Sequence, residues 1–118
     1  MKFDEWTVVL LCRVPNAPAL ATDASATLQD AHLMFLAARH DEGKLLIAGP
    51  AQGPSRADVA GICVYGLASD QARAIAQDDP MVKAGQLRVE VLSWVSPADA
   101  IRPGPGRFPR SIRDVEGP

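Results

Sequence analysis

His32 and Asp79 are the two residues of this chain whose types and positions could carry acid–base chemistry. His32 lies in AHLMFLAA, residues 31–38, where an imidazole stands among almost wholly apolar neighbours. Asp79 comes directly before Pro80, at the end of a polar helix-forming segment. A carboxylate beside an imidazole holds one tautomer of the ring and makes its other nitrogen a better proton acceptor. Such a pair could take a proton from a small molecule and return it.

Each of these residues also has a purely structural interpretation. His32 could be a buried histidine bonded to a backbone carbonyl. Asp79 is well suited to cap the short turn PMVKAG, residues 80–85, because proline is favoured at the first helical position. His40, the other histidine, is rotated away from His32 near the helix end. We interpret His40 as a solvated residue that suits the negative end of the helix.

The elements that must position the pair follow from apolar periodicity and from the helix-breaking residues. A strand is expected over residues 6–14, because WTVVLLCRV is β-branched and aliphatic up to Pro15. Thr22 or Asp23 can cap a helix that runs to about Glu42, where Gly43 supplies a left-handed end. The remaining expected elements are strands over 44–49, 58–67 and 86–95, and a helix capped by Ser69 or Asp70 that stops near Asp79.

The order β-α-β-β-α-β predicts an α+β fold of the ferredoxin-like kind. Right-handed crossovers interleave the two halves into a four-stranded antiparallel sheet with both helices on one face. The helices then run antiparallel, so the end of the second helix comes near the first half of the first helix, where His32 lies. Topology therefore predicts that Asp79 and His32 meet.

The first strand has two apolar faces, whereas two helices can cover only one face of the sheet. Thr7, Val9 and Leu11 point one way, and Val8, Leu10 and Cys12 point the other way. We expect a second copy of the chain to cover the outer face in a symmetric homodimer. Leu92 and Trp94 are expected on that face, and Trp94 could anchor the contact.

The domain is expected to span residues 1–96, with a separate tail at 97–118. That tail is rich in proline, glycine and arginine and lacks hydrophobic periodicity. It is either a solvated tail or an arm that lies across the partner subunit through Phe108. A chain of 118 residues can bury one core of this size, but not two.

Charge and composition exclude several classes of partner. The net charge is −2, with acids and bases intermixed, so neither nucleic acid nor an anionic membrane is favoured. RNA binding by the sheet would also need exposed aromatics on a basic face.

The apolar run 6–12 is too short to span a membrane, and a cytoplasmic location is expected. Cys12 and Cys63 lack metal-ligand spacing and are expected to be reduced core residues.

Four further residues are candidates for substrate binding. Arg13 ends the first strand, and Arg39 shares the helical stripe of His32 and Leu36, so either could meet an anionic substrate. The segment GPAQG, residues 49–53, lacks the spacing of a phosphate loop. We interpret its start, Gly49 and Pro50, as a turn at the lip of a cleft.

Two segments of the chain resemble the signatures of the YciI-like (YCII-related domain) family. These are AHLMFLAARHDEGKLLIAGP, residues 31–50, and DDPMVKAG, residues 78–85, within a likeness that spans about residues 6–96. The resemblance implies a dimeric α+β barrel and a cleft in which His32 and Asp79 form the active site. It also implies chemistry such as the dehydrochlorination of an aromatic-ring breakdown intermediate. Met81 replaces the usual aromatic residue after the Asp-Pro step, which alters the expected pocket shape.

The sequence is compatible with three functions. The first is a cofactor-independent enzyme of the isomerase, lyase or dehydrochlorinase type, with His32 as acid or base and Asp79 as its orienting partner. The second is a non-catalytic dimer that binds a small ligand in the same cleft. The third is haem binding, because related α+β barrels can use a helical histidine as the iron ligand.

Overall fold

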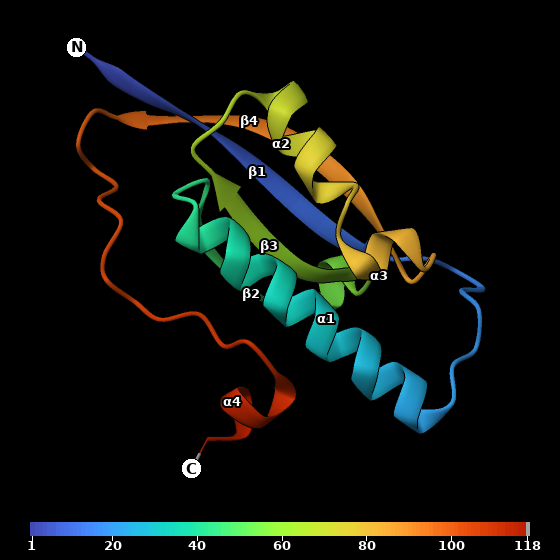
Figure 1. Cartoon of the computed structure of the whole chain (residues 1–118). Helices are drawn as coiled ribbons and strands as arrows, with labels where there is room; N and C mark the ends of the chain where they lie inside the picture. Colours follow the sequence, from blue (N-terminus) through green and yellow to red (C-terminus); the bar gives the residue numbers. More distant parts are fainter. Residues whose placement is uncertain (118) are drawn as a thin grey trace.

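Four antiparallel strands form one sheet in the order β2-β3-β1-β4, as the computed structural model shows (Figure 1). The structure describes residues 1–117. The strands are β1 (Phe3–Arg13), β2 (Leu45–Pro50), β3 (Val59–Tyr65) and β4 (Leu87–Pro97). β1 is central, so that Val9 lies opposite Cys63 of β3 and Val91 of β4. The predicted ferredoxin-like topology is therefore confirmed.

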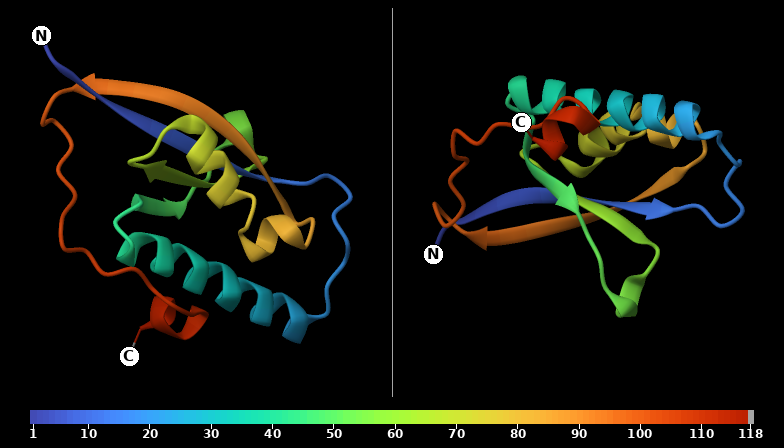
Figure 2. Two further views of the ribbon diagram at one scale, coloured as in Figure 1. Left: turned by 45° about the horizontal axis from the view of Figure 1, so that its top comes forward. Right: turned by 90° about the horizontal axis from the view of Figure 1, so that it is seen from below.

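The two longer helices, α1 (Thr22–Asp41) and α2 (Ser69–Ala76), cover one face of this sheet (Figure 2). α1 ends where Gly43 adopts a φ of 76°, a conformation that glycine reaches without steric cost. Two short helical turns, η1 (Pro54–Arg56) and α3 (Pro80–Lys83), follow β2 and α2 respectively. The last helix is α4 (Ile112–Glu116).

The predicted helix caps were wrong by one or two positions. α1 and α2 begin after Ala21 and Ala68, and neither of these residues offers a side chain to the helix. Ser69, one of the predicted caps of α2, instead lies with its hydroxyl 3.0 Å from that of Ser93. Thr7 on β1 donates to the carbonyl of Leu67 at 2.7 Å. Contacts with the sheet thus hold the start of α2 in place of a side-chain cap.

The core lies between the helices and the inner face of the sheet. Its buried cluster consists of Val9, Leu11, Leu45, Cys63, Tyr65, Ala72 and Ala76. The inner residues of β1 are almost completely buried, whereas Val8 and Leu10 on the outer face are only half-buried. This difference follows from the period of two along a strand, because only the inner face is covered by helices.

The outer face of the sheet carries apolar side chains at the centre of its surface. Trp6 of β1 lies opposite Trp94 of β4, and Val8 lies opposite Leu92. Leu92 and Trp94 keep 55% and 46% of their surface exposed, and Ile62 of β3 keeps 44%. Residues 1–117 place no covering layer on this face, which is the condition for the predicted homodimer.

The C-terminal segment, residues 98–116, returns from the end of β4 to α1 (Figure 1). Arg110 pairs with Asp41 at 2.7 Å, and the backbone N–H of Ile112 donates to the carboxylate of Asp30 at 2.7 Å. The segment therefore folds back onto its own chain, while the boundary at residues 96 and 97 stays a prediction. Among the helices of residues 1–117, none has the length and apolar character needed to cross a bilayer.

Candidate active site

Local sequence explains where both members of the predicted pair lie. His32 is on the side of α1 that faces the core, and only 9% of its surface is exposed. Asp79 follows α2, where Pro80 disfavours helical geometry in the preceding residue, so the chain turns there. Asp79 caps α3 by accepting the backbone N–H of Met81 at 2.9 Å, and it is 1% exposed. The cap interpretation of Asp79 is therefore correct.

The same carboxylate also contacts His32. The Nδ1 atom of His32 lies 2.9 Å from Oδ1 and 2.7 Å from Oδ2 of Asp79. A carboxylate accepts hydrogen bonds and does not donate them, so Nδ1 carries the proton. Nε2 is then the ring nitrogen with a free lone pair, and no group within residues 1–117 hydrogen-bonds to it. Such a geometry would allow a histidine to act as a base with the carboxylate as its orienting partner.

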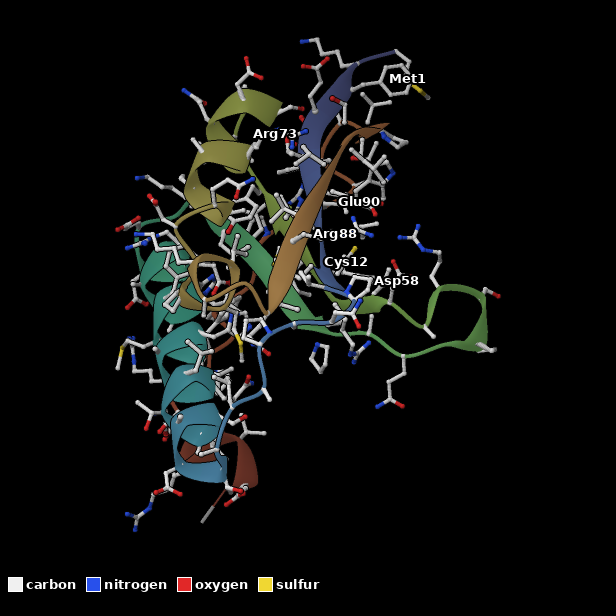
Figure 3. All side chains as sticks on the ribbon, turned by 90° about the vertical axis from the view of Figure 1, so that its right-hand side faces the viewer. Met1, Cys12, Asp58, Arg73, Arg88 and Glu90 are labelled. Carbon is white, nitrogen blue, oxygen red and sulfur yellow. The ribbon has the colours of Figure 1, made fainter. Side chains whose placement is uncertain are left out.

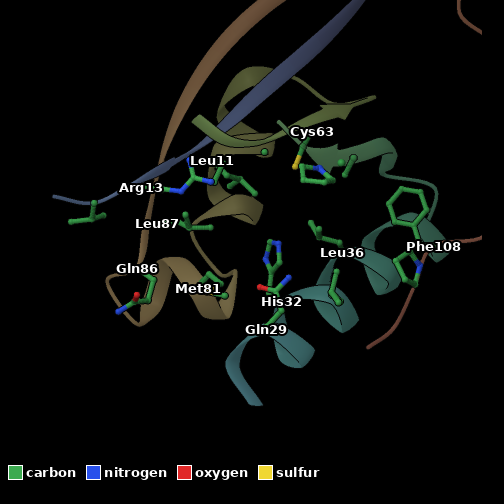
Figure 4. A pocket seen from close by; sticks show the side chains of 18 of the residues that line it. Leu11, Arg13, Gln29, His32, Leu36, Cys63, Met81, Gln86, Leu87 and Phe108 are labelled. Atoms are coloured by element: carbon green, nitrogen blue, oxygen red, sulfur yellow. The ribbon is translucent and has the colours of Figure 1, made fainter. Parts of the chain in front are cut away.

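His32 lines a pocket of about 600 Å³ between the sheet and α1 (Figure 4). Four polar side chains line it, namely Arg13, Gln29, His32 and Gln86. Most of the remaining wall is apolar and includes Leu11, Leu33, Leu36, Met81, Leu87 and Phe108. A mostly apolar pocket with a few convergent polar groups is the usual form of a small-molecule site.

Arg13 brings a positive charge to the pocket. Its Nη1 atom donates to the backbone carbonyls of Ala57 at 2.8 Å and Val59 at 3.3 Å. None of the carboxylates of residues 1–117 forms a salt bridge with it. The backbone therefore fixes the guanidinium while its charge stays available, which suits the binding of an anion.

The structure brings Gly49 and Pro50 to the pocket but does not bring Arg39 there. Gly49 and Pro50 end β2 and line the pocket, and their role as a lip stays a prediction. Arg39 instead forms a bidentate pair with Glu42, at 2.9 and 3.0 Å, and stacks over the ring of Phe35. Arg39 is therefore a salt-bridged residue of α1 and does not belong to the candidate site.

His40 is not the solvated end residue that the sequence indicated. Its Nδ1 lies 2.8 Å from the carbonyl oxygen of Leu45, and its Nε2 lies 3.2 Å from that of Gly106. Its ring stacks on Phe108, with the centroids 4.0 Å apart. The correction arises because the C-terminal segment lies over this end of α1, and no periodic pattern in that segment predicts where it docks.

Sequence reasoning missed Gln29, Gln86 and Phe108 as residues of the pocket. Gln29 precedes His32 by three positions and so lies on the same side of α1, a spacing that could have identified it. Gln86 donates from its side chain to the carbonyl of Pro18 at 2.7 Å, and this bond ties the start of β4 to the loop before α1. No sequence pattern indicates its role.

Cys63 also lines the pocket, but it is unsuited to act as a nucleophile. Burial raises the pKa of its thiol to about 12. The reactive thiolate is therefore a very small fraction of this thiol near neutral pH. We expect a Cys12→Ser chain, whose one thiol is Cys63, to react with Ellman's reagent about 100-fold more slowly when native than when unfolded in guanidinium. Equal rates in the two states would contradict this interpretation.

One cluster of potential metal ligands occurs within residues 1–117, at Cys12, Asp58 and Glu90 (Figure 3). Arg56 pairs with Asp58 at 2.9 Å, and Arg88 pairs with Glu90 at 2.6 Å. These hydrogen bonds lower the pKa of both carboxyl groups, while burial raises that of the Cys12 thiol. Two guanidinium groups thus already pair with the carboxylates that a cation would need. We interpret the cluster as an ion-pair network.

Comparison with known proteins connects this chain to one family. The model of the YCII-related domain matches residues 7–95. Among curated protein sequences, none matches the chain. A solved structure of 5-chloro-2-hydroxyhydroquinone dehydrochlorinase (TftG) from Burkholderia phenoliruptrix AC1100, in complex with 2,5-dihydroxybenzoquinone, is similar with a TM-score of 0.54. The identity is 19%, and the alignment covers 75% of this chain and 92% of TftG. This similarity shows a shared fold.

Proposed function

Since the chain belongs to the YCII-related domain family, with the protomer fold of the dimeric α+β barrels, we propose that it is a small-molecule enzyme. In this proposal His32 and Asp79 form an acid–base pair of the isomerase, lyase or dehydrochlorinase type. The observation that carries it is the contact of the Asp79 carboxylate with Nδ1 of a histidine that lines the pocket. That contact leaves Nε2 free to meet a substrate.

Nε2 of His32 takes a proton from the substrate in the first step. The electron pair of the broken C–H bond forms a double bond to the neighbouring carbonyl carbon, while the carbonyl π electrons move onto the oxygen to give an enolate. The proton makes His32 an imidazolium. Asp79 stabilises the imidazolium, because its negative charge lies within hydrogen-bond distance of Nδ1. Catalysis of this kind rests on a positioned acid–base group and its orienting partner.

The second step decides the reaction type. In an isomerase, His32 returns the proton to a different atom of the same substrate. In a lyase or dehydrochlorinase, a leaving group such as chloride departs with its bonding electron pair, and the imidazolium then gives its proton to water. The products of the dehydrochlorination are the unsaturated molecule, one proton and one chloride ion, so atoms and charge balance.

The pocket favours a small, largely apolar substrate that carries an anionic or carbonyl group. Arg13 is the cation that would bind this group, while Gln29 and Gln86 add hydrogen-bonding capacity. Gly49 and Pro50 would form the lip over which the substrate enters. The ligand and substrate named for TftG are small ring compounds with oxygen substituents, which makes such compounds the first to test on this chain.

A paired binding and turnover experiment tests the proposal. The purified chain is titrated with 2,5-dihydroxybenzoquinone by calorimetry, and chloride release is followed with 5-chloro-2-hydroxyhydroquinone and a panel of chlorinated and carbonyl-bearing acids. We expect both saturable binding and turnover above the uncatalysed rate. Binding throughout the panel without any turnover would contradict catalysis and would support the alternative, a non-catalytic ligand-binding dimer.

We also propose that a second copy of the chain covers the outer face of the sheet. The proposal is supported by the exposure of Leu92, Trp94 and Ile62 on a face that none of the helices within the described residues covers. Clusters of exposed large apolar residues on one face are typical of interfaces rather than of solvated surfaces. A homodimer that packs sheet against sheet would remove this surface from water.

Leu92→Glu is expected to weaken the homodimer by at least about thirtyfold, because a charge would be buried at a central interface position. Sedimentation velocity over a range of concentrations measures the effect. Val115→Glu is the matched control, because Val115 is similarly exposed, at 61%, but lies on α4 away from the sheet. A chain that stays monomeric before any substitution, or a dimer indifferent to Leu92→Glu, would refute the interface.

A further inference from the structure

Phe108 forms part of the pocket wall although it belongs to the C-terminal segment. It is half-buried and packs against the core cluster, and with Pro109 it lines the pocket. In Figure 4, Phe108 and Arg13 lie toward opposite ends of the pocket, with His32 between them. A ligand that places its anionic group at Arg13 and passes over His32 would therefore extend its apolar part toward Phe108.

Contacts with α1 on both sides of Phe108 hold this wall in place. On one side, His40 stacks on the Phe108 ring with an interplanar angle of 9°, and its Nε2 lies 3.2 Å from the Gly106 carbonyl oxygen. On the other side, Arg110 pairs with Asp41. Because the segment is anchored before and after Phe108, the ring is fixed relative to the pocket in spite of the irregular backbone around it.

The wall comes from residues beyond the matched domain. The YCII-related match ends at residue 95, so residues 98–116 lie beyond it. A family-level site assignment therefore covers His32 and Asp79 but not Phe108. A residue that closes a pocket from outside the matched domain is well placed to distinguish this chain's ligands from those of its relatives.

We propose that Phe108 is a specificity-determining residue that limits how far the apolar part of an anionic ligand can extend from Arg13. The inference rests on the proposed small-molecule site, but it concerns selectivity of binding and does not depend on turnover. An alanine at position 108 would open space for a larger apolar group. A tryptophan there would remove space that the natural pocket offers.

A graded series of carboxylates tests this proposal. Benzoate, 2-naphthoate and biphenyl-4-carboxylate share one anionic group and differ in the length of the apolar part. Their dissociation constants are measured by calorimetry on the full chain and on Phe108→Ala and Phe108→Trp. We expect Phe108→Ala to shift the preference toward the longer carboxylates by about tenfold, and Phe108→Trp to shift it toward benzoate by a similar factor.

Phe3→Ala is the matched control, since it makes the same substitution at a 56% exposed residue outside the pocket. It should leave the order of affinities unchanged. Hydrogen exchange of the Ile112 amide, which donates to Asp30, reports whether the C-terminal segment stays docked in each variant. If Phe108→Ala releases the segment, the same affinities are measured on Phe108→Leu. Leucine keeps an apolar contact with the segment's neighbours but extends less far into the pocket.

The outcomes separate this inference from the proposed reaction. An order of affinities that stays the same to within about twofold in the docked Phe108 variants would refute the inference, even if the chain releases chloride. Failure of all three carboxylates to bind the natural chain would refute it as well. A shifted order without turnover of any compound would support Phe108 as the selective wall and would count against catalysis.

Discussion

Replacing His32 by glutamine is expected to lower turnover by about 100- to 10 000-fold, the usual contribution of a positioned acid–base group. Glutamine can fill much of the space of the ring and can hydrogen-bond to Asp79. It cannot take up a proton and release it, so the step assigned to Nε2 fails while the pocket keeps its shape. The measurement is a steady-state comparison of kcat and KM on whichever compound the natural chain turns over.

Met34→Gln is the control for this substitution. Met34 lies two residues further along α1 and is 49% exposed, so the variant introduces the same side chain outside the pocket. It should leave both kinetic constants unchanged. If His32→Gln raises KM while kcat is retained, His32 is a binding residue only, and the acid–base mechanism is wrong.

The sequence was sufficient to predict the contact between His32 and Asp79, because two strong local signals fixed it. The apolar and β-branched segments defined the β-α-β-β-α-β order, and this order determines which helix ends meet. The Asp-Pro step then fixed where the chain turns after α2, since proline restricts the residue before it. Both signals depend on local stereochemistry. The packed structure keeps the elements and the turn that they predict.

Arg39 and His40 show where helical periodicity stops being informative. Arg39 shares the stripe of His32, but Glu42 lies three residues further along and captures its guanidinium. The ring of His40 meets Gly106 and Phe108, which are more than sixty positions further along the chain. A stripe predicts which way a side chain leaves the helix, but it does not predict what the rest of the chain places there.

The same limit applies to the pocket as a whole. Its predicted half, which includes His32, Arg13, Gly49 and Pro50, comes from regular elements and the residues at their ends. Its unpredicted wall comes from Phe108, in a segment whose many prolines and glycines give no periodic signal. Single contacts such as the Arg110–Asp41 pair determine the position of that segment, and such contacts are not encoded in any local pattern.

Asp79→Asn is expected to reduce turnover by about 100- to 10 000-fold while it leaves most of the fold's stability intact. Asparagine caps helices about as well as aspartate, so the bond from the Met81 N–H to position 79 should survive. The amide can, however, turn its NH₂ group toward Nδ1 of His32. Nδ1 would then accept, the proton would move to Nε2, and the ring would lose the lone pair that the reaction needs.

Asp78→Asn provides the matched control, because it makes the same change one residue earlier, at a side chain that is 69% exposed. Thermal or urea unfolding separates the two roles of Asp79. The exchange of a charge-assisted hydrogen bond to His32 for a neutral one should cost about 1 kcal/mol in the free energy of unfolding. Asp79→Ala removes the cap as well and should cost about 1 kcal/mol more. Full turnover in Asp79→Asn would show that Asp79 serves as the cap of α3 alone, because only the contact with His32 depends on its being a carboxylate.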